Sequence, residues 1–275
     1  MSQVGGGCPW PARAGQGRAL GGLRLSGVTK RYGEKAVVSG LSLTVEPGVV
    51  ASLVGPNGCG KSTTCAMIAG LRTPDEGRIS VSGYDTVASP LDARRNLGFV
   101  PDNPSGFEQL DVREYMDLYR DLYRQPRARF EERAQVVLEA FGLLEHEGTN
   151  LGELSHGLRR KVAMTAALSL GVQNVLIDEP TVGLDPEGMV VLRRLVRHIG
   201  RRGSAVLLTT QDLAFAERVC DRLFLIHGGR MVAEGSPALL RERYRAFSVE
   251  EAFLAATGIG RRIDDFEQRL ETFPR

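Results

Sequence analysis

The stretch that decides the fold is "VVASLVGPNGCGKSTT", residues 49–64. Its first half is a run of apolar and β-branched residues, which is typical of a buried strand. The run leads directly into Gly55-x-x-x-x-Gly60-Lys61-Ser62, and the chain continues as the helix-like "TTCAMIAGL". A strand, a glycine-rich turn and a helix in this order predict a loop that wraps phosphate groups.

The residue types of this loop explain how it would bind phosphate. Glycines let successive backbone N–H groups turn inward, and the following helix adds the positive end of its dipole. Lys61 supplies a point charge for the β- and γ-phosphates, and the Ser62 hydroxyl can ligate Mg²⁺. An ordinary glycine turn with a surface lysine does not account for the flanking strand and helix. We expect nucleotide contacts from the whole loop: Gly55, Pro56, Asn57, Gly58, Cys59, Gly60, Lys61, Ser62 and Thr63.

A second apolar strand, in "NVLIDEP" (174–180), ends in two carboxylates. Asp178 would lie at the C-terminal edge of the sheet, beside the phosphate loop, where it can hold Mg²⁺ directly or through water. Glu179 points differently because side chains alternate along a strand, so it is placed to orient or deprotonate an attacking water. An isolated Asp-Glu pair after a strand is usually solvated charge, but next to a phosphate loop it predicts a catalytic edge.

The rest of the chain divides by its hydrophobic period. Residues 1–22 are rich in Gly, Pro and Arg without a period, which predicts a disordered N-terminal tail. Alternating segments before the phosphate loop, "LRLSGVTKRYG" and "VVSGLSLTVEPG", predict antiparallel strands, and "GRISVSG" (77–83) and "NLGFVP" (96–101) predict further short strands. From about 104 to 171 the period becomes helical, with a capping box at Asp111 and Glu114. Strands and helices then alternate, which predicts an α/β fold with a mostly parallel sheet, an antiparallel β subdomain and an α-helical subdomain.

Composition narrows the class of protein. The chain has 275 residues, 42% hydrophobic and 25% charged, which suits one large domain with an insertion. A net charge of +2 is too small to indicate nucleic acid as a partner. The four cysteines have no CxxC spacing, so no zinc or redox motif is predicted. The sequence shows no signal peptide and no apolar run long enough for a transmembrane helix, so any membrane role would depend on a partner.

The order of these motifs over about residues 23–258 resembles the ATP-binding subunit of ABC transporters. "LSHGLRR" (154–160) is similar to the family's signature loop, and "GLDP" (183–186) to the loop that follows the second phosphate-site strand. Tyr32 in "KRYG" matches the aromatic residue that stacks on adenine. The resemblance implies an ATP-binding domain at 23–247, followed by a C-terminal helical extension at 248–275.

The resemblance also implies a mechanism. Two such subunits meet head to tail with two ATP molecules between them, and Ser155, His156 and Gly157 of one subunit contact the γ-phosphate bound by the other. Asp185 would lie at this dimer interface. ATP and Mg²⁺ are the implied ligands, and the partners are a second ATPase subunit, identical or different, and a separate transmembrane permease. The protein would therefore be cytoplasmic, at the inner face of the cell membrane. "SVEEAFLAATG" (248–258) resembles the C-terminal segment of ABC-2-type drug and antibiotic exporters, although a generic closing helix explains it equally well.

Several positions depart from the family's pattern. Asp102 stands where a Gln usually ligates Mg²⁺, and a carboxylate can still serve as that ligand. His156 and Leu158 replace a Gly and a Gln of the signature. Gln211 stands where a His usually contacts the γ-phosphate; its amide can donate a hydrogen bond but carries no charge. We therefore expect slow but real hydrolysis, with Glu179 as the main catalytic group and Gln211 assisting it.

Two other functions stay open at the level of sequence. A soluble ABC ATPase acting on DNA or ribosomes would be favoured by a long coiled-coil insert or a second cassette, and this sequence shows neither. An ATP-dependent clamp or regulatory subunit would hydrolyse ATP only marginally, and Asp102 and Gln211 favour it. Lys61, Asp178 and Glu179 argue against a dead site.

Overall fold

The computed structural model describes residues 21–260. The predicted N-terminal tail, apart from its last two residues, lies outside the described residues. The same holds for residues 261–275 of the predicted C-terminal extension.

One sheet has four antiparallel strands, two of which come before the phosphate loop in sequence and two after it. Its strand order is β2-β1-β4-β5. Alternate residues of β1, including Leu23 and Leu25, are buried, as the alternating pattern predicts for a sheet with one covered face. The strands are β1 (Leu23–Tyr32), β2 (Lys35–Val45), β4 (Glu76–Val81) and β5 (Tyr84–Asp85).

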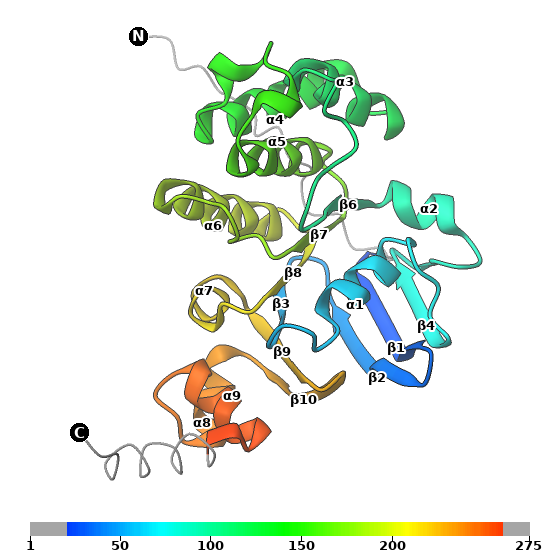
Figure 1. Ribbon diagram of the computed structural model, residues 1–275, viewed down its shortest axis with the longest axis vertical. Helices are drawn as coiled ribbons and strands as arrows, with labels where there is room; N and C mark the ends of the chain where they lie inside the picture. The colour runs from blue at the N-terminus through cyan, green and yellow to red at the C-terminus, as the bar shows by residue number, and fades with distance from the viewer. Residues whose placement is uncertain (1–20, 261–275) are drawn as a thin grey trace.

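A six-stranded sheet of order β10-β9-β3-β8-β7-β6 forms the centre of the molecule (Figure 1). The paired neighbours are parallel except for β10, which returns beside β9 after the turn at Gly228 and Gly229. The strands are β3 (Val50–Val54), β6 (Leu97–Val100), β7 (Asn174–Asp178), β8 (Ala205–Thr210), β9 (Arg222–His227) and β10 (Arg230–Gly235). Since β3, β7 and β8 run parallel, their C-terminal ends meet at one edge, where the phosphate loop begins.

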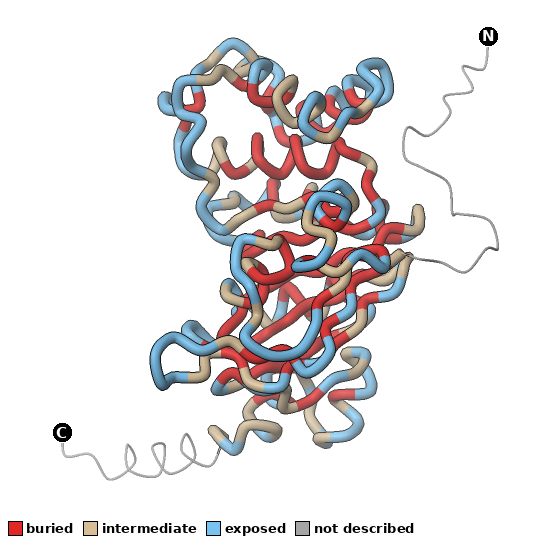
Figure 2. The backbone as a smooth tube through the Cα atoms, turned by 90° about the vertical axis from the view of Figure 1, so that its right-hand side faces the viewer, coloured by how far each residue is buried: buried red, intermediate tan, exposed pale blue. Residues whose placement is uncertain are grey.

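The central sheet is covered on both faces. Every residue of β3, β7 and β8 is buried, which explains why these strands read as continuous apolar runs. Successive residues of β3 belong to two different hydrophobic clusters, with Val50 and Val54 in one and Ala51 and Leu53 in the other. Figure 2 shows the buried chain running through the middle of the molecule, with exposed turns around it.

The helices around this core are α1 (Lys61–Ile68), α2 (Pro90–Arg95), α6 (Pro186–Arg201), α7 (Leu213–Val219), α8 (Pro237–Tyr244) and α9 (Val249–Thr257). Neither α2 nor α8 was predicted from the sequence. Both are too short to show a helical period, but each has a Ser N-cap followed by Pro, at Ser89 and Ser236. That pair of residues is a local signal of a helix start.

Between β6 and β7 the chain is helical and forms a layer above the sheet (Figure 1). It contains α3 (Val112–Leu122), α4 (Arg127–Ala140) and α5 (His156–Ser169), with short 3₁₀ turns η1 (Leu144–His146) and η2 (Leu151–Glu153). The predicted capping box at the start of α3 is confirmed, because Asp111 and Glu114 each accept the other's backbone N–H. Helix α5 contacts α3, α4 and β6, so it joins the helical layer to the central sheet.

Candidate functional site

The phosphate loop occupies residues 55–60, between the end of β3 and the start of α1. Gly60 has φ 104°, and a Cβ there would lie 2.7 Å from the carbonyl oxygen of Val37. Only glycine fits both constraints. No side chain among the described residues caps α1 at Gly60. The first N–H groups of this helix are therefore available to an anion.

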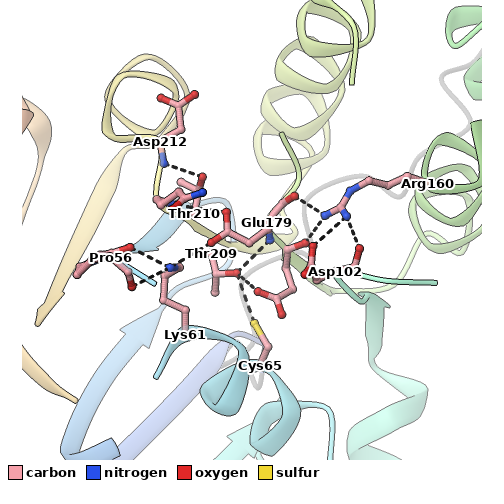
Figure 3. A network of polar contacts seen from close by, with 12 residues as sticks. Pro56, Lys61, Cys65, Asp102, Arg160, Glu179, Thr209, Thr210 and Asp212 are labelled. Carbon is pink, nitrogen blue, oxygen red and sulfur yellow. Dashed lines mark hydrogen bonds and ion pairs between the residues drawn. The ribbon is translucent and has the colours of Figure 1, made fainter. Parts of the chain in front are cut away.

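Lys61 folds back over the loop from the first position of α1. Its Nζ donates to the carbonyl oxygens of Gly55 at 2.9 Å and Pro56 at 3.2 Å. The same Nζ lies 3.1 Å from Oε1 of Glu179, which comes from the end of β7 (Figure 3). The structure thus brings the phosphate loop and the second predicted motif into direct contact through a buried ion pair.

Glu179 adopts a backbone conformation that is rare for its residue type. Its φ is 47°, in the left-handed region, although it is not glycine. Its Oε2 accepts the backbone N–H of Gln211 at 3.3 Å, while Oε1 faces Lys61. Backbone strain of this kind persists only where surrounding contacts fix it, and it concentrates at functional sites. Glu179 is therefore held in a single orientation at the edge of the sheet.

Asp178 ends β7 and is buried. Its Oδ1 accepts the hydroxyl hydrogen of Thr209, the residue that pairs with it on β8. Ser62, which the sequence predicts as the second Mg²⁺ ligand, lies exposed in the first turn of α1. Within residues 21–260 no group of three or more His, Cys, Asp or Glu residues could hold a metal. One buried carboxylate and one hydroxyl beside a phosphate loop fit Mg²⁺, because this ion takes few protein ligands and completes its shell with water and phosphate oxygens.

Asp102 follows β6 and lies near these motifs, but its carboxylate already has a partner. Oδ1 of Asp102 lies 3.1 Å from the guanidinium of Arg160, and the Asp102 side chain is 53% exposed. Gln211 directly follows β8 and is exposed. The backbone of Gln211, rather than its amide, makes the contact with Glu179.

Arg160 was not predicted from the sequence as a residue of the site. This side chain of α5 is completely buried, and its guanidinium donates to the backbone carbonyls of Asp102, Asp178 and Glu179 (Figure 3). It therefore links the helical layer to both carboxylates and to the Asp102 loop. A signal was present, because Arg160 precedes Ala163, Met164 and Ala167 by three, four and seven residues and so lies on the buried face of its helix.

The predicted signature loop packs on the predicted dimer loop of the same chain. Ser155 caps α5, and its Oγ accepts the N–H of Leu158 at 3.2 Å. A Cβ at Gly157 would lie 2.4 Å from the carbonyl oxygen of Gly183, so this contact requires glycine. His156, the third residue of the signature, is exposed.

Asp185 fixes the dimer loop in place. It caps α6 by accepting the N–H of Gly188 at 2.8 Å, and it pairs with Lys161 at 3.2 Å. These two contacts lower the pKa of the Asp185 carboxyl below its usual value. The carboxylate therefore stays charged at neutral pH.

Tyr32 ends β1 and is 49% exposed, with Lys30 Nζ 5.9 Å from its ring centroid. The hairpin that carries it also approaches the phosphate loop, because Val37 of β2 abuts Gly60. A flat aromatic ring is thus exposed near the loop, as stacking on a base requires.

Comparison with known proteins agrees with this geometry. Residues 38–182 match the ABC transporter family model. The chain is 38% identical over 231 residues to Nod factor export ATP-binding protein I of Rhizobium sp. (strain N33), covering 84% of this chain and 76% of the relative. It is 36% identical over 214 residues to a daunorubicin resistance ATP-binding protein of Streptomyces coeruleorubidus, covering 78% and 68%.

Solved structures give the same result. An ATP-binding subunit of an ABC transporter matches with a TM-score of 0.82 and 32% identity, over 86% of this chain and 99% of that one. A dimeric ATP-binding cassette in a post-hydrolysis state, bound to ADP and Pi, matches with a TM-score of 0.70 and 26% identity, over 78% and 98%.

The chain therefore belongs to the family of ABC transporter ATP-binding proteins, and it is an ATPase of that type. The predicted family and fold class are confirmed. In the part of the chain that the structure describes, no helix is both long and apolar enough to cross a membrane.

Proposed function

We propose that this protein is the ATP-hydrolysing subunit of an exporter and drives a separate permease. The observation that carries this proposal is the 3.1 Å contact between Lys61 and Glu179, which puts the residue that would bind the γ-phosphate beside the residue that would activate water. Export is supported by the relatives, which include export and drug-resistance ATP-binding proteins.

The residues divide the chemistry among them. The free N–H groups at the start of α1 and the Lys61 ammonium bind the phosphates, and Tyr32 stacks on adenine. When Lys61 turns from Glu179 to the γ-phosphate, the carboxylate of Glu179 is released to accept a proton from water. Ser62 and Asp178 are the residues that would hold Mg²⁺, with Asp102 able to join them if it leaves Arg160. The ion neutralises charge on the phosphate oxygens.

The site is completed by a second ATPase subunit, which is another copy of this chain or a related one. Ser155, His156 and Gly157 lie at the N-terminus of α5, where backbone N–H groups attract an anion. Asp185 fixes the adjoining loop, so that the signature and the dimer loop present one surface. The dimeric cassette bound to ADP and Pi supports this arrangement.

The permease contact is expected at the loop that precedes α3. Phe107 is 40% exposed there, and its ring begins a series of aromatic contacts that continues through Tyr115, Tyr119 and Tyr123 at centroid distances of 5.5, 4.8 and 6.3 Å. The hydroxyl of Tyr123 donates to the carbonyl of Leu97, the first residue of β6. A rigid series of rings thus connects the surface loop to the strand that leads to Asp102. The protein would act at the inner face of the cell membrane.

Size-exclusion chromatography tests the dimer. Glu179→Gln should bind ATP without cleaving it, so MgATP should convert this variant from monomer to dimer. Adding Ser155→Arg should abolish the shift while leaving nucleotide binding by the monomer intact. A monomer with MgATP bound to Glu179→Gln would contradict the proposed head-to-tail mechanism.

A photo-crosslinker tests the permease contact. In cells of the source organism, benzoylphenylalanine in place of Phe107 should yield an adduct with an integral membrane protein. The same group in place of Phe247, which is exposed near the C-terminal helices, is the matched control. Equal adducts at both positions, or a soluble partner alone at Phe107, would contradict the proposed docking surface.

A clamp with marginal hydrolysis is the second candidate, favoured by the uncharged amide at Gln211. Direct measurement of turnover separates the two.

A further inference from the structure

Thr209 lies at the centre of the catalytic edge, beside Asp178 and Glu179. It lies on β8 directly opposite Asp178, and none of its surface is exposed. Its hydroxyl contacts three groups: the Asp178 carboxylate, the Cys65 thiol of α1 at 3.8 Å, and the Glu179 backbone N–H at 3.2 Å, which also donates to the Thr209 backbone carbonyl at 3.0 Å (Figure 3).

The direction of the hydroxyl hydrogen follows from these partners. A hydroxyl has one hydrogen to donate and two lone pairs to accept with. The backbone N–H of Glu179 can only donate, and the carboxylate of Asp178 can only accept. The Cys65 thiol supplies the remaining donor. All three bonding positions of the Thr209 oxygen are therefore used, and its hydrogen must point at Oδ1 of Asp178.

The Cys65 thiol is fixed as a donor by its surroundings. It is buried between α1 and the sheet, and its Sγ lies 3.8 Å from the Thr209 hydroxyl oxygen, to which it donates. Helix α1 also carries Lys61 and Ser62 in its first turn. Through one hydroxyl, the helix that would hold the phosphates is thus connected to the Asp178 carboxylate and to the backbone of Glu179.

Packing alone does not require this hydroxyl. Valine has nearly the same shape, prefers strands equally well and is cheaper to bury, because a hydroxyl must find hydrogen-bond partners to offset its desolvation. Ser52 on the neighbouring strand β3 provides a comparison. Its Oγ is also buried, but it has no hydrogen-bond partner within residues 21–260.

We propose that Thr209 is a positioning residue whose hydroxyl holds the Asp178 carboxylate in the geometry needed for Mg²⁺. The proposal rests on the ATPase function above. Removing a partner that orients a metal-binding carboxylate typically costs about 10- to 100-fold in metal affinity or activity. Loss of the hydroxyl should thus act through Mg²⁺ and turnover, and should leave the affinity for ATP without the ion unchanged.

The test compares Thr209→Val, Thr209→Ser and Thr209→Ala with Ser52→Ala, a control that removes a buried hydroxyl with no described partner. Fluorescent ATP binding is titrated with Mg²⁺ and in EDTA, in a Glu179→Gln background, and turnover is measured in the otherwise unchanged chain. We expect Val and Ala at position 209 to raise the Mg²⁺ concentration needed for half-maximal binding by about 10-fold or more and to lower kcat similarly. Thr209→Ser and Ser52→Ala should have a Mg²⁺ requirement and a kcat close to those of the wild type.

The Ser and Ala variants differ by the hydroxyl alone, so this pair decides the question even if the Val variant does not fold. Equal Mg²⁺ requirements for the two, or equal losses in Thr209→Ala and Ser52→Ala, would overturn the proposal. A wild-type chain that neither binds nor hydrolyses ATP would instead overturn the proposed function, so the two failures are distinguishable.

Discussion

At the residue scale, the carboxylate of Glu179 is the most constrained catalytic candidate. One oxygen faces the Lys61 ammonium and the other accepts the Gln211 backbone N–H, while the left-handed backbone fixes the direction of the side chain. When Lys61 turns to the γ-phosphate, the main-chain contact and the backbone conformation still hold the carboxylate in place, and such preorganisation is a major source of catalytic rate. Gln211 contributes to this constraint through its main chain, which a substitution of its side chain leaves in place.

Substitutions at Gln211 should therefore change turnover without abolishing it. Removing a preorganised donor costs about 10²–10³-fold in comparable sites, so we expect Gln211→Ala to lower kcat by about 10-fold or more and Gln211→His to raise it. Steady-state hydrolysis of MgATP measures both. Identical kcat values for Ala, Gln and His at this position would show that its side chain takes no part in hydrolysis.

Cys59 gives a pH-dependent probe of the phosphate loop. Burial raises the pKa of its thiol, and the nearby Lys61 charge opposes that effect only in part. Because the thiolate is the reactive form, alkylation should be slower than for a free thiol at pH 7 and should accelerate as the pH rises above 9. Mass spectrometry of Cys59 with and without MgATP checks this.

Bound nucleotide should protect Cys59, and Cys220, buried elsewhere in the molecule, is the internal control. Labelling of Cys59 that is equally fast with saturating nucleotide would count against this placement of the site.

At the scale of elements, one side chain of α5 joins this helix to the catalytic edge of the sheet. Arg160 donates to the carbonyls of Asp102, Asp178 and Glu179, which belong to the loop after β6 and to the end of β7. Movement of the helical layer would thus be transmitted directly to the Asp102 loop and to the catalytic edge.

We expect Arg160→Met to reduce the free energy of unfolding by about 3 kcal/mol, because it leaves several buried carbonyls without donors. Asp102→Ala should cost about 1 kcal/mol or less, since its carboxylate is half exposed. Arg159→Met, one residue earlier in the same helix, is the matched control. Urea titrations compare the three variants. Equal stability of Arg160→Met and Arg159→Met would refute the anchoring role.

The elements show what sequence can and cannot predict. Strand, loop and helix around Gly55–Ser62 were predictable because periodicity and glycine placement are local signals. The start of α3 was predictable from its capping box at Asp111 and Glu114. Arg160 and Thr209 were not identified, because their contacts join residues far apart in the chain: 58 positions between Arg160 and Asp102, and 31 between Thr209 and Asp178. The pairing of Asp102 with Arg160 is likewise a consequence of tertiary packing.

At the scale of the whole molecule, the phosphate loop contacts both sheets. It joins β3 to α1, contacts the β1–β2 hairpin through Gly60 and reaches the end of β7 through Lys61. A ligand bound there contacts several parts of the fold at once, so it should stabilise the whole chain.

ATP with Mg²⁺ at about 100 times its Kd should add about 2.7 kcal/mol to the stability of the folded state. Thermal unfolding of the Glu179→Gln variant, which prevents turnover, measures this gain. Adding Lys61→Ala should remove most of it. A gain that survives Lys61→Ala would place the nucleotide elsewhere on the molecule.

The most direct test of the central claim is MgATP hydrolysis by the purified chain beside Glu179→Gln, with nucleotide binding measured on both. We expect slow, Mg²⁺-dependent turnover by the wild type. Glu179→Gln should lower kcat by at least about 10²-fold and should bind ATP as tightly as the wild type does. If the wild type binds ATP and turns over no faster than Glu179→Gln, then Glu179 is not the catalytic base of this chain, and the protein acts as an ATP-dependent clamp.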